Sequence, residues 1–133
     1  MNSFPQNSTV VLVHGAWADG SCWKELILPL ERQGLKAACA PIPLTSLSDD
    51  VSALTRALEQ TSGPVVLVGH AYGGAVIGAI REERVKSFVY VAALAPDEGE
   101  TVAQVFYRDK PHQEQPKLTP DKLWFHLDAR GRL

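Results

Sequence analysis

The sequence predicts an α/β protein of three layers (α/β/α), in which helices cover both faces of a parallel sheet. Short runs of β-branched and other apolar residues alternate along the chain with segments whose apolar residues recur every three or four positions. Strands and helices that alternate in this way form parallel sheets with right-handed crossovers. The 133 residues are 45% hydrophobic, which is enough for one core of this kind.

The first strand is expected at residues 9–14, where a run that is apolar on both faces stops at Gly15. A helix follows, and Gly34 is placed to end it. Its buried face is marked by apolar residues three or four positions apart: Trp23, Leu26, Ile27 and Leu30.

The second strand is expected at residues 35–40, and a second helix follows it. Ser46 or Ser48 can cap that helix, and Asp49 and Asp50 are favourably placed near its positive end. The predicted buried face of this helix consists of Leu47, Val51, Leu54 and Leu58.

The third strand is expected at residues 65–68, where Gly69 closes it, and a helix of small and apolar residues should span 73–83. The fourth strand is expected at 85–94. The parallel sheet would therefore contain four strands, one for each apolar run.

The pattern weakens after Pro96, so residues 1–96 are expected to form the core and residues 97–133 a separate, less regular region. A further helix is expected within 97–106, and residues 123–127 are compatible with a short strand or a docked turn. The last residues are expected to form an irregular tail.

Composition excludes several classes of protein. The net charge of −2 leaves no basic excess for nucleic-acid binding, and the longest apolar runs are too short to span a membrane. The N-terminus has no signal-peptide pattern. Two cysteines, Cys22 and Cys39, form neither a disulfide framework nor a metal cluster, so we expect a cytoplasmic protein without a metal.

A glycine-flanked turn, residues 69–74, lies between the third strand and the next helix. Strand, tight turn and helix in this order are typical of a nucleophile elbow, whose central residue, here Ala71, sits on a strained turn. The backbone N–H of Tyr72 should point to the same spot, and the loop after the first strand should add that of Ala16 or Trp17. These donors predict an oxyanion hole for acyl transfer, with Trp17 and Tyr72 also contacting the substrate.

Three segments together carry a family resemblance: residues 11–17, 67–76 and 91–100. They resemble the α/β-hydrolase superfamily, and most closely a bacterial esterase-like branch similar to plant methylesterases and hydroxynitrile lyases. The resemblance implies the N-terminal half of that fold, with strands in the order 2-1-3-4 and a helical cap that starts after Pro96. It also implies hydrolysis of small carboxylic esters through an acyl-enzyme, without a metal or an organic cofactor.

The sequence departs from this family in two ways. Ala71 occupies the nucleophile position, and a methyl group cannot attack a carbonyl carbon. The family's acid and histidine belong to strands beyond the fourth, so the chain is interpreted as truncated and catalytically inactive. Three explanations are open for Ala71: an engineered knockout, a natural variant that has lost or changed its activity, or a purely structural turn. The third explanation is disfavoured because such a turn need not be strained.

Other reactive residues have simpler interpretations. Cys22 has no adjacent base in the sequence, so it is expected to be a small apolar residue rather than a substitute nucleophile. His70 should hydrogen-bond to backbone under the turn, and His14 should shape the loop that follows it. His112 and His126 are expected to be loop residues.

The alternative hypothesis is a non-catalytic module of the same fold that binds a small ester-like ligand without turning it over. A nucleotide site is disfavoured because no Gly-x-Gly-x-x-Gly pattern follows the first strand. The fourth strand would be a long apolar edge, so we expect residues after Pro96 or a partner chain, such as a second copy in a homodimer, to cover it.

Overall fold

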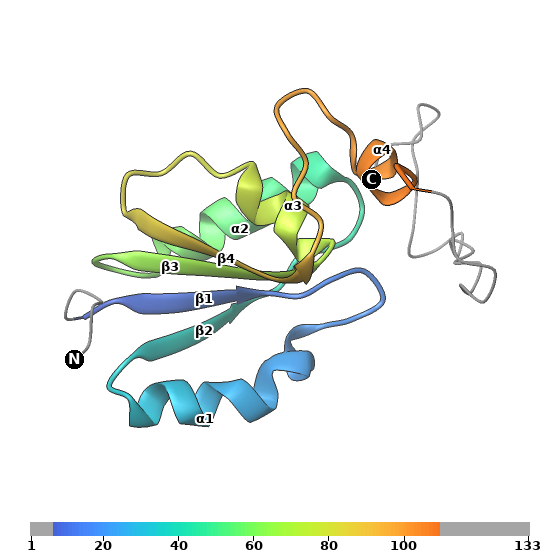
Figure 1. The fold of residues 1–133 in the computed structure, drawn as a ribbon. Coiled ribbons are helices and arrows are strands. Elements are labelled where there is room, and N and C mark those ends of the chain that lie inside the picture. The colour runs from blue at the N-terminus through green and yellow to red at the C-terminus, as the bar shows by residue number, and fades with distance from the viewer. Residues whose placement is uncertain (1–6, 110–133) are drawn as a thin grey trace.

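The computed structural model describes residues 7–109, which form a parallel sheet covered by helices on both faces (Figure 1). The four strands lie in the order β2-β1-β3-β4. The predicted fold class and strand order are therefore confirmed. The strands are β1 (Thr9–Val13), β2 (Lys36–Ala40), β3 (Val65–Ala71) and β4 (Val85–Ala93). The helices are α1 (Lys24–Arg32), which a 3₁₀ turn (η1, Gly20–Trp23) precedes, α2 (Leu47–Glu59), α3 (Gly73–Gly78) and α4 (Val102–Phe106).

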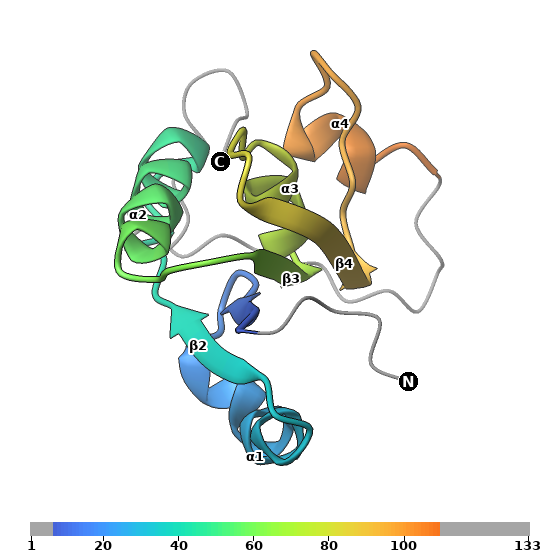
Figure 2. The same cartoon turned by 90° about the vertical axis from the view of Figure 1, so that its left-hand side faces the viewer.

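Two apolar clusters hold the layers together. One joins α2 and α3 to the sheet, and the smaller one joins Trp23 and the inner side of α1 to the opposite face. Viewed along the strands, α2 and α3 lie on one side of the sheet and α1 on the other (Figure 2). All five residues of β1 are buried, as expected for a strand whose two faces are both covered.

The predicted helix boundaries hold where the sequence carries a capping residue. The hydroxyl oxygen of Ser46 accepts a hydrogen bond from the Asp49 backbone N–H at 3.0 Å, so Ser46 caps α2. Gly34 follows α1 with φ +79°, the left-handed conformation that glycine adopts without a steric penalty.

The predicted C-terminal ends of two elements were wrong by three or more residues. β3 does not close at Gly69 but continues to Ala71, because its pairing with β4 continues through His70. α3 ends at Gly78 instead of reaching residue 83. Its last turn is tightened by a hydrogen bond from the Ile80 N–H to the Ile77 carbonyl, and the chain then turns back into β4.

β4 is one of the two outer strands of the sheet within the described residues, and β2 is the other. The nine residues of β4 include four large apolar side chains that are 40–43% exposed: Phe88, Val89, Tyr90 and Val91. Register pairing with β3 places Phe88 and Tyr90 on the α3 side and the two valines on the α1 side. The strand is thus an apolar edge, as predicted, and its cover stays a prediction.

The predicted helix within 97–106 is α4, which starts later than its acidic residues suggested. Thr101 and Gln104 form a capping box at its start. The predicted element at 123–127, together with His112 and His126, lies outside the described residues. None of the helices described is long and apolar enough to cross a membrane.

Candidate active site

The turn after β3 is built by close backbone contacts. Ala71 has φ +51°, a left-handed conformation that is rare for a residue with a side chain. A Cβ atom on Gly69 would lie 2.7 Å from the Gly73 carbonyl carbon. A Cβ atom on Gly73 would lie 2.5 Å from a carbonyl oxygen of β1, and one on Gly74 would lie 2.2 Å from the carbonyl oxygen of Leu94. Each glycine is therefore required because backbone fills the space of a side chain.

The loop after β1 lies directly against this turn. A Cβ atom on Gly15 would lie 3.0 Å from the Ala71 Cβ atom and 3.6 Å from the Tyr72 backbone nitrogen. Ala16 packs on the core cluster, while Trp17 is 46% exposed and has φ +58°. The structure thus brings together the two segments that the sequence singled out.

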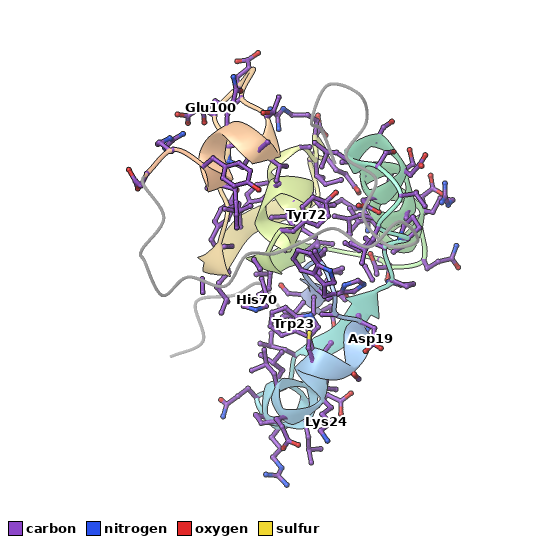
Figure 3. All side chains as sticks on the ribbon, turned by 90° about the vertical axis from the view of Figure 1, so that its right-hand side faces the viewer. Asp19, Trp23, Lys24, His70, Tyr72 and Glu100 are labelled. Atoms are coloured by element: carbon purple, nitrogen blue, oxygen red, sulfur yellow. The ribbon has the colours of Figure 1, made fainter. Side chains whose placement is uncertain are left out.

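The side chain of Tyr72 points away from this surface. It is 4% exposed, and its hydroxyl donates a hydrogen bond to Asp50 Oδ2 at 2.5 Å. Burial, together with this carboxyl group, raises the pKa of the phenol. Figure 3 views the C-terminal ends of the strands and shows Tyr72 on the opposite side of the sheet from Trp23. A ligand above Ala71 would therefore meet the backbone of Tyr72 rather than its phenol.

Asp50 is a residue whose place in the site the sequence reasoning missed. It is 1% exposed, and its Oδ1 atom accepts a hydrogen bond from the Leu44 backbone N–H at 2.7 Å. Burial raises its pKa, against the opposing effect of its hydrogen bonds. The signal was present in the sequence, because Asp50 lies three residues after Leu47 and four before Leu54, on the buried face of α2.

Backbone strain marks one end of the sheet. Four residues other than glycine have positive φ where the four strands end: Trp17 after β1, Leu44 after β2, Ala71 at the end of β3 and Ala92 near the end of β4. Such strain persists only where the surrounding structure holds it, and it clusters at functional sites. The loop after β2, with Leu44, is thus a third segment at this end.

The two histidines near the turn hold backbone, as predicted. His70 Nδ1 donates to the Val91 carbonyl oxygen at 2.8 Å, and its ring meets Trp23 edge-on. His14 is buried, donates from Nδ1 to the Gly15 carbonyl oxygen at 2.9 Å, and accepts from the Ile42 N–H through Nε2 at 3.4 Å. These contacts tie the His14 ring to the loop after β1 and to the loop after β2.

Cys22 has the opposite of an activated environment. Burial raises the pKa of its thiol, and neighbouring Cys39 and Asp19 raise it further, whereas a nucleophilic cysteine needs a lowered pKa. Both cysteines are free. Among residues 7–109, no three His, Cys, Asp or Glu side chains are grouped so that they could hold a metal ion.

Known proteins are similar to the chain in both sequence and fold. The chain is 29% identical over 109 residues to a carbendazim hydrolyzing esterase of Nocardioides sp. (strain SG-4G), covering 69% of the chain and 44% of that protein. It is 31% identical over 112 residues to the putative methylesterase 11, chloroplastic, of Arabidopsis thaliana, covering 72% of the chain and 29% of the relative. An extracellular alpha/beta-hydrolase from a Paenibacillus species superposes with a TM-score of 0.66 at 26% identity, covering 72% and 45%.

The chain thus spans less than half the length of each of these relatives. A family model matches residues 10–132 of the chain. The sheet order and the paired segments at residues 11–17 and 67–76 agree with that match. On these grounds the chain belongs to the alpha/beta hydrolase family.

Proposed function

We propose that the chain carries the nucleophile elbow and the oxyanion loop of an esterase-type hydrolase, with Ala71 at the nucleophile position. The observation that carries this proposal is the left-handed φ of Ala71 at the end of β3, with Gly15 packed against its Cβ atom. Strained turns of this kind expose a nucleophile at the C-terminal end of a parallel sheet. The relatives named as esterases support the same reaction class.

The chemistry assigns a role to each residue of the site. In acyl transfer, the nucleophile attacks the ester carbonyl carbon and two backbone N–H groups stabilise the oxyanion that forms. Tyr72 and either Ala16 or Trp17 would supply these donors. Ala71 has no oxygen to form the acyl-enzyme, so we infer that the chain does not hydrolyse esters by this route.

An ester hydrolysis assay tests this proposal. The chain and its Ala71→Gly variant, which lacks the methyl group, are incubated with p-nitrophenyl acetate and with a serine-directed phosphonate. We expect neither protein to exceed the buffer rate, and we expect intact mass spectrometry to show no phosphonate adduct. Turnover by the parent chain that disappears in proportion to phosphonate labelling would overturn the proposal.

A second function is favoured by the strain itself. The turn keeps its left-handed alanine and its close glycine contacts although no nucleophile uses them. This suggests a site that binds a small ester-like ligand without turnover. Methyl benzoate, added to ¹⁵N-labelled chain, should shift the amide signals of Gly15, Ala16 and Tyr72, and mass spectrometry should show the ester intact. Shifts confined to other regions would contradict a ligand at this site.

We also propose that the outer edge of β4 is covered, by residues after Pro96 or by a partner chain such as a second copy. The exposed apolar side chains on both faces of this strand support the proposal. Hydrogen exchange tests it, because an uncovered edge strand bonds only every second amide. Protection of consecutive β4 amides is expected, and protection of alternate amides alone would contradict it.

The two free thiols support a reducing, cytoplasmic compartment.

A further inference from the structure

We propose that Asp50 is a positioning residue for the site at Ala71. Its buried carboxyl group would hold the Tyr72 side chain and the Leu44 backbone in place, and with them the turn that contains Ala71 and the loop after β2. The inference rests on the proposed function, since it concerns a ligand bound above Ala71. Asp50 itself lies beneath that surface and would not touch the ligand.

One side chain joins two loops at the end of the sheet. Asp50 Oδ2 accepts from the hydroxyl of Tyr72, the residue after Ala71, at 2.5 Å. Asp50 Oδ1 accepts from the backbone N–H of Leu44, in the loop after β2, at 2.7 Å. Asp50 comes from α2, so its carboxyl group joins the loop just before this helix to a turn 22 residues further along the chain.

The loop after β1 is joined to the same network. His14 Nε2 accepts from the Ile42 N–H, two residues before Leu44. Gly15 in turn packs against Ala71. His14 and Asp50 therefore fix the loop after β2 from two directions, and this loop connects to both segments that would supply oxyanion donors.

A carboxyl group is a costly choice for packing alone. Asp50 is 1% exposed, and none of the ion pairs formed among residues 7–109 involves it. An apolar residue on this face of α2 would avoid the free energy needed to desolvate a carboxyl group. Both oxygens are instead used to hold loop atoms, which favours a role in fixing one loop conformation.

Asp50 bonds to one strained residue and to the neighbour of another. Leu44 has φ +60° and Ala71, next to Tyr72, has φ +51°. Left-handed conformations of such residues persist only where neighbouring contacts impose them. These two hydrogen bonds add to the close glycine contacts that already hold the turn at Ala71, so their loss would loosen both segments.

Four variants of the full chain test the role of Asp50 by NMR. Tyr72→Phe removes only the hydroxyl group, and Asp50→Leu removes the carboxyl group. Asp50→Asn keeps an acceptor for Leu44 and can donate to the Tyr72 oxygen, so it serves as the conservative rescue. Asp49→Asn is the matched control, since Asp49 is the exposed neighbour on the same helix.

Without ligand, Tyr72→Phe and Asp50→Leu should shift and broaden the amide signals of Leu44, residue 72 and Gly15. The amides of Leu67 and Val68, in the middle of β3, should stay unchanged. With methyl benzoate as the probe, the dissociation constant should rise about tenfold in Tyr72→Phe. Asp50→Asn and Asp49→Asn should remain within about twofold of the parent.

The inference is overturned if Tyr72→Phe lowers the free energy of unfolding but leaves the Leu44 and Gly15 amides as in the parent. Asp50 would then stabilise the core only. If Asp50→Leu does not fold, Tyr72→Phe decides the question alone. If the parent does not bind methyl benzoate, the proposed binding function fails, while the ligand-free amide signals still decide the role of Asp50.

Discussion

The two ends of the sheet differ in the residues that adopt positive φ angles. At the end where the strands begin, positive φ angles fall on Asn7, Gly34 and Gly63. At the end where the strands finish, positive φ angles fall on the non-glycine residues Trp17, Leu44, Ala71 and Ala92. Figure 1 shows all four strands pointing toward this second end.

The choice of residues at positive φ distinguishes turns that serve only the fold from turns that belong to a functional site. Glycine, and to a lesser degree asparagine, adopt left-handed angles with little steric cost, whereas other residues lose about 1–2 kcal/mol each. Turns that serve only the fold would be expected to carry glycine at both ends. The strained end is also where parallel α/β sheets bind ligands, outside the carboxyl ends of the strands.

The largest expected effect comes from filling the tightest backbone contact of the strained end. Gly74→Ala would place a Cβ atom 2.2 Å from the Leu94 carbonyl oxygen, so α3 and β4 must move apart. We expect the free energy of unfolding to fall by about 3 kcal/mol, measured by urea denaturation. Gly78→Ala is the control on the same helix, because its Cβ atom would meet only the Tyr90 hydroxyl, at 3.3 Å. Equal losses in both variants would contradict the assignment of the contact.

A smaller effect on the free energy of unfolding is expected from the titration of two neighbouring carboxyl groups, Asp49 and Asp50. Burial raises the pKa of Asp50, so the stability it contributes is present below the unfolded value of about 3.9 and declines as the pH rises through the raised folded value. The side-chain hydrogen bonds from Thr45 and Ser46 lower the pKa of Asp49. Its contribution is therefore present above that unfolded value and declines as the pH falls.

Urea denaturation between pH 3 and pH 8 should therefore give opposite slopes for two variants. The stability of the parent relative to Asp50→Asn should decrease with rising pH, and that relative to Asp49→Asn should increase. Slopes of the same sign would show that burial does not control the pKa of Asp50.

The smallest expected effect tests the strain directly. Ala71→Gly should raise the free energy of unfolding by up to about 1 kcal/mol, because relief of the left-handed angle exceeds the added entropy of glycine in the unfolded chain. Gly34→Ala should lower it by about 1 kcal/mol, since its φ is +79° and no atom lies within 4 Å of the added methyl group. Thermal denaturation of the pair measures both changes. A destabilising Ala71→Gly would remove the argument for strain at the site.

Much of the fold and part of the site follow from the sequence. The four strands, the Gly34 turn and the approach of the loop after β1 to Ala71 were predictable from local signals, because apolar period and glycine spacing mark them. The strand order followed from the family resemblance instead. The end of α3 was not predictable, since its residues favour a longer helix and only the return into β4 ends it.

The loop after β2 shows a different limit. Leucine has no local preference for the left-handed region, so nothing in the sequence near Leu44 predicts its positive φ. Its conformation depends on a carboxyl group from the following helix. Asp50 itself had a periodic signal, but its charge suggested an exposed position near the helix start.

The glycine contacts of the turn also have a consequence for the order of folding. Gly73 touches the backbone of β1, about sixty positions earlier in the chain, and Gly74 touches the residue that follows β4. The turn around Ala71 therefore cannot take its final shape until β1, β3 and β4 have assembled. Contacts of such long sequence separation form late and slowly. Ligand binding above Ala71 would accordingly report the completed sheet, and a bound ligand would slow global unfolding rather than the opening of one loop.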